Sequence, residues 1–190
     1  ELEPGRTETA APAGAARWRS SPRARAPGAV RGSPKELERV LAQNPADAET
    51  HFNLAVVLTQ RGSYEAAIQA YERCLALEPG NARARNNLAI RYAAQGRLEE
   101  ARRQLAQAVE IDPHYAEAAF NLGVVLDQAG QPRAAAEWVA KALENEPDNP
   151  RFHFALGSLY RALGENERAR RHLDRAAAGG FRPPPAAPNQ

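Results

Sequence analysis

Apolar and small residues recur along most of the chain with a period of 34 residues. Residues 53–67 read NLAVVLTQRGSYEAA, and successive steps of 34 lead to NLAIRYAAQGRLEEA, NLGVVLDQAGQPRAA and ALGSLYRALGENERA. In each copy a Leu, the small residue after it and a large residue four positions after the Leu share one helical face. A Gly then precedes a second stretch in which Ala and large apolar residues also recur at helical spacing. Each copy therefore predicts a pair of antiparallel helices.

The repeat also predicts where the elements lie. The first helices are expected at 48–60, 82–94, 116–128 and 150–162, and the second helices at 64–77, 98–111, 132–145 and 166–178. Each pair is joined through a glycine, which adopts the left-handed conformation that often ends a helix: Gly62, Gly96, Gly130 and Gly164. A proline ends each unit or precedes the first: Pro45, Pro79, Pro113 and Pro147. Since one pair cannot cover its own apolar face, the four pairs are predicted to stack around a continuous core.

A half-unit is predicted before the first full unit. Ser33 and Glu36 fit a capping box, and Pro34 stands at the first helical position, where its missing N–H costs nothing. Residues 33–45 match only the second helix of a pair, because residues 14–26 lack the Leu and small residue of a first helix.

The stack is predicted to end after residue 180. Two positions late in the second helices are expected to receive the next unit, and they are occupied by Leu75 and Leu77, Val109 and Ile111, and Leu143 and Asn145. The last unit has Ala177 and Gly179 at these positions. The last helix is also highly charged outside its core positions, as the outer face of a terminal repeat must be.

The two ends of the chain have a different composition. Residues 1–32 are rich in Pro, Ala, Gly and Arg without helical or strand periodicity, so a disordered arm is predicted there, with Trp18 a solvated linker residue. A disordered Pro-rich tail is predicted at 181–190. The arm carries six Arg and three acidic residues, and since the whole chain has a net charge of +2, the remainder carries −1. Nucleic-acid binding would therefore depend on the arm and on salt, and is not the expected function.

The four in-phase copies resemble the tetratricopeptide repeat (TPR), whose period is 34 residues. The resemblance covers residues 48–180, as units 48–81, 82–115, 116–149 and 150–180, together with the half-unit. It implies an all-α, right-handed superhelical solenoid of about nine helices. In such proteins the first helices line a concave groove that binds a peptide or a helical segment of a partner protein.

The groove predicted from this resemblance is formed by recurring positions of the first helices. It comprises Glu49, Phe52, Asn53, Val56, Gln60, Arg83, Asn86, Asn87, Ile90, Glu117, Phe120, Asn121, Val124, Asp127, Arg151, Phe154, Ser158 and Arg161. Its charges are of both signs, which favours an amphipathic or mixed-charge ligand over a polyanion.

An asparagine recurs at one position of the groove, as Asn53, Asn87 and Asn121. A side-chain amide both donates and accepts, so a row of amides would pair with the backbone of an extended peptide. This row resembles the asparagine ladder of the TPR superhelix in O-GlcNAc transferase, although the fourth unit has Ala155 there. The alternative is that these amides satisfy local backbone groups.

Phenylalanines form a second row, Phe52, Phe120 and Phe154, which would anchor apolar side chains of a ligand. The alternative is that each ring packs against a neighbouring helix. The carboxylate clamp of some TPR domains is matched only at Asn87, so binding to the acidic tails of the large chaperones is not predicted.

No set of residues suggests catalysis, a metal site or a cofactor. The four histidines, His51, His114, His153 and His172, fall in different units or helix phases and are expected to be packing or surface residues. The single cysteine, Cys74, stands at a small buried position, where it is expected to pack. No apolar run reaches the roughly 18 residues of a membrane span.

The sequence therefore predicts a non-catalytic scaffold that binds a protein or peptide, as a monomer or with weak self-association. The alternative is the substrate-recruiting portion of a larger glycosyltransferase of the O-GlcNAc-transferase type, with its catalytic domain outside this chain. The absence of Met indicates that Glu1 is not a translation start, so a fragment or processed form is expected. Cytoplasmic localisation is slightly favoured, and a periplasmic location would follow if an upstream signal were removed.

Overall fold

The computed structural model describes residues 32–182, which form helices joined by short turns. The predictions of a disordered arm at 1–32, including Trp18, and of a disordered tail at 181–190 fall almost wholly outside this range. In the described part the helices are α1 Pro34–Gln43, α2 Ala48–Gln60, α3 Tyr64–Leu77, α4 Ala82–Ala94, α5 Leu98–Ile111, α6 Ala116–Gln128, α7 Pro132–Asn145, α8 Pro150–Ala162 and α9 Asn166–Ala178. These bounds coincide with the predicted ones in all four units, and the all-α solenoid is confirmed.

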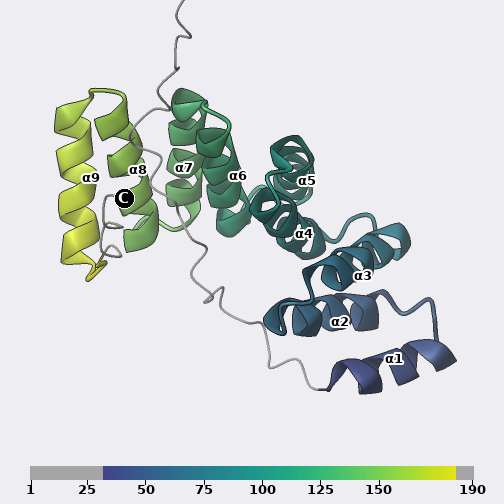
Figure 1. The fold of residues 1–190 in the computed structure, drawn as a ribbon. Helices are drawn as coiled ribbons and strands as arrows, with labels where there is room; N and C mark the ends of the chain where they lie inside the picture. The colour runs from purple at the N-terminus through teal and green to yellow at the C-terminus, as the bar shows by residue number, and fades with distance from the viewer. Residues whose placement is uncertain (1–31, 183–190) are drawn as a thin grey trace, which may run out of the picture.

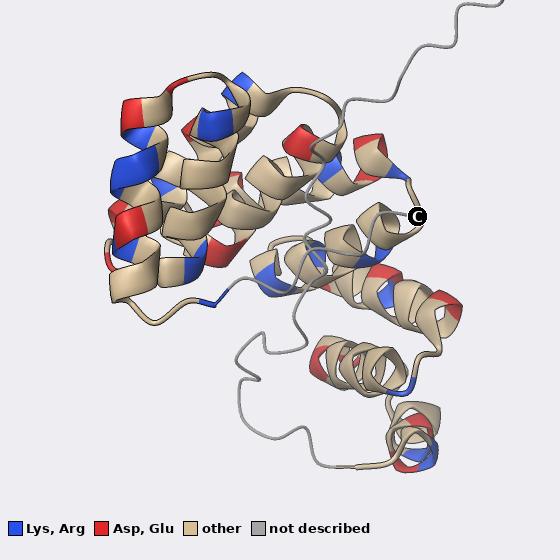
Figure 2. Ribbon diagram, turned by 60° about the vertical axis from the view of Figure 1, so that its left-hand side comes forward, with Lys and Arg blue, Asp and Glu red and all other residues tan. Residues whose placement is uncertain are grey.

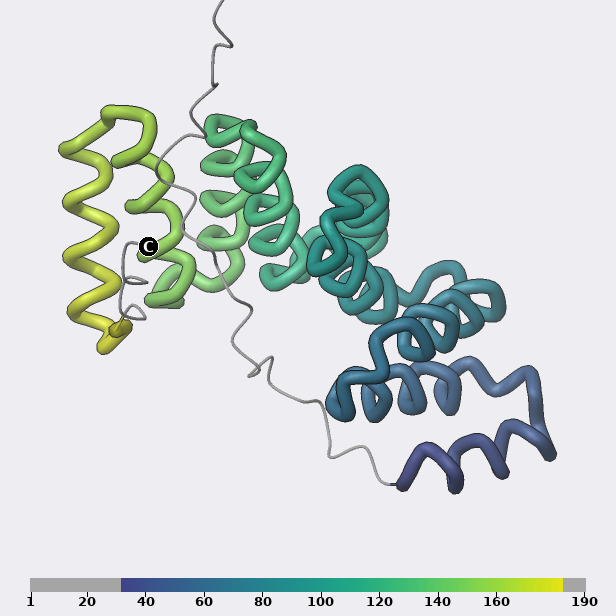
Figure 3. Tube along the Cα trace, in the orientation of Figure 1, coloured from purple at the N-terminus to yellow at the C-terminus, as the bar shows by residue number. Residues whose placement is uncertain are grey.

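The helices form hairpins that follow one another in a curved arc from α1 to α9 (Figure 1). Each hairpin pairs the first and second helix of a unit, as α2 with α3 and α8 with α9, and each second helix then packs against the next first helix. The Cα trace shows the same succession without a long connection between units (Figure 3). Contacts between neighbours in sequence therefore build the whole molecule.

The turn inside each hairpin depends on its glycine. The backbone angle φ is +79° at Gly62, +76° at Gly96, +75° at Gly130 and +79° at Gly164, in the left-handed region. The residue after each glycine donates its N–H to the carbonyl five residues before it, as Ser63 does to Leu58 at 2.9 Å. This bond satisfies a carbonyl at the end of the first helix and reverses the chain.

The turns between units are held by a bond that the sequence analysis did not foresee. His51 Nε2 lies 3.0 Å from the carbonyl oxygen of Pro45, and His153 Nε2 lies 2.9 Å from that of Pro147. Arg85, at the same position of the second unit, donates from its guanidinium to the carbonyl of Pro79 at 2.7 Å. The third unit has Ala at this position, and Asn145 of α7 donates to the carbonyl of Pro113 instead, at 3.3 Å.

The core lies between the helices of each hairpin, where small residues allow close approach. Ala55 and Ala89 are fully buried, and so is Cys74, as predicted. At Gly123 an added Cβ would lie 2.6 Å from Val139 Cγ2 and 2.9 Å from the Ala135 carbonyl oxygen. At Gly157 an added Cβ would lie 2.8 Å from Leu173 Cγ. The backbones of α6 and α7, and of α8 and α9, are therefore too close for any larger residue at these positions.

Two predictions about the ends of elements were wrong. Leu77 and Ile111 remain 38% and 43% exposed, whereas the other predicted apolar contact residues, Leu75, Val109 and Leu143, are partly buried against the core. Phe181 does not begin a solvated tail, since its N–H donates to the Ala176 carbonyl at 3.0 Å and its ring packs against Phe154 with centroids 4.9 Å apart. The capping box of α1 is confirmed, with Ser33 and Glu36 each bonding to the other's backbone N–H.

Candidate functional site: the face of the first helices

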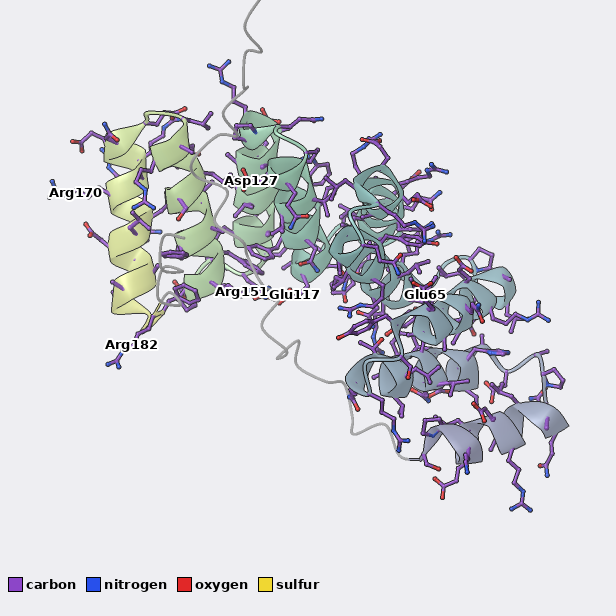
Figure 4. The ribbon with its side chains drawn as sticks, in the orientation of Figure 1. Glu65, Glu117, Asp127, Arg151, Arg170 and Arg182 are labelled. Carbon is purple, nitrogen blue, oxygen red and sulfur yellow. The ribbon has the colours of Figure 1, made fainter. Side chains whose placement is uncertain are left out.

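The predicted groove residues lie on α2, α4, α6 and α8, and this surface is here called the first-helix face. Four of its side chains are exposed and most of the others are half-buried. The exposed ones are Glu49, Gln60, Arg83 and Arg161, and the half-buried ones are Asn53, Val56, Asn87, Ile90, Glu117, Asn121, Val124, Asp127, Arg151, Phe154 and Ser158. Figure 4 shows Glu117 and Arg151 close together on the inner side of the arc.

The predicted row of phenylalanine anchors is not accessible. Phe52 and Phe120 are buried, with 7% and 4% of their surface exposed, because each ring fills the space between neighbouring helices. Phe52 meets Tyr71 edge-on at 5.9 Å between ring centroids, and Phe120 stacks on Phe152 at 4.6 Å. Phe154 is half-buried against Phe181. The alternative of packing against neighbours therefore holds for Phe52 and Phe120.

Aliphatic side chains are presented where the phenylalanines are not. Val56, Ile90 and Val124 occupy the same position of the first three units, and all three are half-buried. Val56 and Val124 pack in part against the core, so their remaining surface is fixed in place. The fourth unit has Ser158 at this position, so the aliphatic row spans three units.

The asparagines of the second and third units are linked to one another. Asn121 of α6 donates its amide to Asn86 Oδ1 of α4 at 2.8 Å, and Asn86 donates to Asn87 Oδ1 at 3.3 Å. Asn86, predicted as a groove residue, is 4% exposed, because these two bonds draw its amide into the junction between the units. Asn87 and Asn121 keep unused amide capacity, since each side chain has two N–H donors and an acceptor oxygen.

Two arginines at equivalent positions lie over phenylalanine rings of the preceding unit. The guanidinium carbon of Arg83 is 5.0 Å from the centroid of Phe52, and that of Arg151 is 4.4 Å from the centroid of Phe120. Arg151 also forms an ion pair with Glu117, so its charge is compensated within the protein. α4 and α8 thus share an arginine over a phenylalanine ring, but of these two only the arginine of α8 is paired with a glutamate within the described part of the chain.

Asp127 adds a half-buried carboxyl group to the first-helix face on α6. Burial raises the pKa of this carboxyl above its ordinary value. A cationic or donor group of a ligand would therefore compensate a charge that the protein leaves poorly solvated.

Models of the tetratricopeptide repeat match residues 58–119, 92–153 and 128–184, and a further model of the same repeat matches residues 31–82. These matches cover most of the chain. The chain belongs to the tetratricopeptide repeat family. Proteins of this family are typically non-catalytic scaffolds for protein interactions, and the fold and the repeat predicted from the sequence are confirmed.

Solved structures of TPR proteins resemble the chain over most of its length. A crystal structure of MamA is 23% identical, with a TM-score of 0.74, over 80% of this chain and 88% of that one. MamA from Desulfovibrio magneticus RS-1 is also 23% identical, with a TM-score of 0.72, over 79% and 87% of the two chains. The PilF protein of Pseudomonas aeruginosa is 30% identical, with a TM-score of 0.72, over 77% and 67%. A comparison with curated proteins gave no match.

The TPR stack brings together two histidines that the sequence analysis treated as separate. His153 of α8 is buried, and its Nδ1 lies 2.9 Å from His172 Nδ1 of α9. Since the Pro147 carbonyl can only accept, His153 Nε2 carries the proton there, and Nδ1 of the neutral ring accepts from His172. Burial lowers the pKa of His172, and the electrostatic effects of His153 and Arg175 lower it further. The sequence would have indicated this contact only if the residues of α8 had been aligned with those of α9 in the register of the TPR hairpin.

The other candidate chemistry of the TPR units is structural. Burial raises the pKa of the Cys74 thiol to about 11, so the thiolate that reactive cysteines use is disfavoured. Within residues 32–182 no three His, Cys, Asp or Glu side chains are grouped to hold a metal ion. None of the described helices has the length and apolar character to cross a membrane.

Proposed function

We propose that the first-helix face of the first three units binds an extended segment of a partner protein. The observation that carries the proposal is the recurrence of two side-chain types at the repeat spacing. Half-buried aliphatic residues, Val56, Ile90 and Val124, run beside the amides of Asn53, Asn87 and Asn121. An extended peptide offers the same alternation of apolar side chains and backbone amides along its length.

The scaffold is ordered before the ligand arrives, which favours binding. Asn121 is held by its bond to Asn86, and Val56 and Val124 are partly fixed against the core. Association therefore orders mainly the partner segment and costs less conformational entropy than the ordering of two flexible surfaces. Phe181 covers part of the fourth unit at Phe154, which supports a binding surface centred on units one to three.

The chain itself would then have no catalytic role. It would hold partner proteins together, and any reaction would belong to those partners. The alternative role, as the substrate-recruiting part of a larger glycosyltransferase, would use the same asparagine row.

A library of random displayed peptides selected on the full chain tests this proposal. Replacement of Asn53, Asn87 and Asn121 by Ala should weaken selected peptides at least about tenfold, since each amide bond contributes about 1 kcal/mol. A second variant, with Val56, Ile90 and Val124 replaced by Ser, should weaken them similarly.

The matched control replaces Gln69, Arg103 and Glu137 by Ala, at one exposed position of the second helices. This variant should bind like the unchanged chain, and circular dichroism should show that all variants keep their helices. If the asparagine variant and the aliphatic variant both bind as tightly as the unchanged chain, the first-helix face is excluded as the ligand site.

A further inference from the structure

Arg83 is an arginine of the first-helix face whose positive charge no ion pair within residues 32–182 compensates. It is exposed, and its guanidinium rests over the buried ring of Phe52, which supports the side chain on the first-helix face. A guanidinium over an aromatic ring keeps its edge N–H donors free to bond to another group. Arg83 is therefore held in position, and within residues 32–182 its donors make no hydrogen bond or ion pair.

Comparison with Arg151 shows what is missing. Arg151 repeats the arrangement two units later, over Phe120, and there Glu117 of the preceding unit completes it with an ion pair. Glu49 stands at the corresponding position before Arg83, yet no carboxylate among residues 32–182 lies within ion-pair distance of Arg83. Among the described residues, the arginine of the fourth unit is therefore neutralised by a glutamate and the arginine of the second unit is not.

The local field adds to the uncompensated charge. Arg83 lies in the first turn of α4, which contains no acidic residue. The N-terminus of a helix carries a partial positive charge, so a cation there is disfavoured and an anion is favoured. The first turns of α2 and α6 each carry a glutamate, as the helix dipole prefers.

A hydrogen-bond donor lies in the same region. Tyr115, at the start of α6, is half-buried. The charges of Arg83 and Glu117 both influence the pKa of its hydroxyl. Burial is the main reason that the pKa of this hydroxyl is raised to about 12. The phenol therefore keeps its proton, and Glu117 is already paired with Arg151.

We infer that Arg83, supported by Phe52, binds the carboxylate of an aspartate or glutamate side chain in the partner segment. The inference rests on the proposed function and specifies the ligand. The guanidinium offers two parallel N–H donors that match the two oxygens of a carboxylate. Val56 and Ile90 lie on the same face in the first and second units, so the acidic residue is flanked by aliphatic ones in the segment.

The carboxylate belongs to a side chain and not to the end of the partner chain. The first-helix face continues on both sides of Arg83, toward Val56 in one direction and toward Asn121 in the other. A segment that uses both parts must pass Arg83 in its interior.

A positional-scanning library of acetylated and amidated peptides, applied to the full chain, tests the inference. The blocked ends remove terminal charges, so selection reports side chains alone. We expect enrichment of Asp or Glu at one position, beside positions that favour aliphatic residues. The Arg83→Gln variant should lose the acidic preference and bind the selected acidic peptides about three- to fivefold more weakly, as for a solvent-exposed ion pair. Arg83→Glu should change the preference at that position to Lys or Arg.

The matched control is Arg103→Gln, which removes an exposed arginine of α5, outside the first-helix face, and should leave the acidic preference unchanged. Aliphatic selection without an acidic preference, or the same acidic preference in Arg83→Gln, would overturn the inference and leave the proposed function standing. A library from which the unchanged chain selects nothing would contradict both. Arg83 is exposed, so circular dichroism should show the same helix content in each variant.

Discussion

At the scale of single residues, small side chains decide how closely the helices pack. Gly123 and Gly157 stand where Ala55 and Ala89 stand in the other units, and the space for a Cβ differs between the two pairs. The first two units have Ala at this position, but the α6–α7 and α8–α9 hairpins leave no space for the Cβ of an Ala. Close approach gains dispersion contacts along the whole crossing, so a single methyl group has a large effect there.

We expect Gly123→Ala to lower the free energy of unfolding by about 1–3 kcal/mol, as other overpacked sites do. The added Cβ would meet Val139 and the backbone oxygen of Ala135, and a backbone atom cannot rotate away. Urea denaturation followed by circular dichroism measures the change. Gly80→Ala is the control, because nothing lies within 4 Å of a Cβ at Gly80, and its stability should be nearly unchanged. Equal effects of the two substitutions would refute the close approach of α6 and α7.

The histidine pair of α8 and α9 makes stability depend on pH. In the unfolded chain His172 takes up a proton near the ordinary histidine pKa of about 6.5, whereas in the fold its pKa is lowered. Below that pH the unfolded state binds more protons than the folded state, so stability falls as the pH falls. Thermal unfolding between about pH 7.5 and about pH 5.5 should show this loss in the unchanged chain and a smaller loss in His172→Gln. The same slope in both proteins would mean that the pair does not control the transition.

At the scale of elements, the helices at the two ends are held differently from those within the stack. Among the described residues α1 packs mainly against α2, and its Leu37 is buried. Val40 of α1 is 44% exposed. α9 is rich in charged residues, and its C-terminal end meets the start of α8 at Gly179, where a Cβ would lie 2.7 Å from Pro150. Few contacts therefore hold α1, and its unfolding need not involve the rest of the stack.

We expect Leu37→Ala to release α1 locally and Leu105→Ala to destabilise the stack as a whole. Leu105 is fully buried in α5, so its truncation should cost about 2–5 kcal/mol. Hydrogen exchange distinguishes the two results. Leu37→Ala should accelerate exchange in Pro34–Gln43 only, whereas Leu105→Ala should accelerate it in α4 to α7. Faster exchange throughout the chain in Leu37→Ala would show that α1 is an integral part of the fold.

At the scale of the whole molecule, stability is built from contacts between neighbouring units. Long-range contacts join consecutive hairpins, and in the described part of the chain α1 and α9 lie at opposite ends of the arc (Figure 1). Acidic and basic residues are interspersed along the helices, as the turned view shows, which agrees with the small net charge of +2 (Figure 2). Such a molecule is expected to gain stability with each unit and to lose it when a unit is removed.

A chain that ends at Asn149 should therefore unfold at a lower urea concentration than the full chain. It would lack α8 and α9, and so leave Phe120 without the stacked ring of Phe152. The apolar surface of α7 would also be uncovered, and we expect self-association at high protein concentration, detectable by light scattering. The full-length variant Arg151→Gln separates loss of the ion pair from loss of the unit, since an ion pair of this kind contributes at most about 1 kcal/mol. An unchanged urea midpoint in the shortened chain would contradict this account.

The sequence by itself determined the helices, their bounds and their order. The 34-residue period, the glycine that each hairpin turn requires and the proline between units are local constraints, and they recur four times, so each copy supports the others. It also determined which face of the first helices is presented, because a position within a helical repeat fixes the direction of its side chain.

Only the tertiary structure decided which of those side chains are accessible and which meet one another. The sequence predicts Phe52 and Phe120 as ligand anchors. In the fold both rings fill the space between neighbouring helices, so both are buried. Arg151 forms an ion pair with Glu117, whereas Arg83 has no ion-pair partner among residues 32–182, although Glu49 and Phe52 precede Arg83 at the positions of Glu117 and Phe120. Contacts across units depend on the spacing and angle of the hairpins, and the periodicity of the sequence does not record either of them.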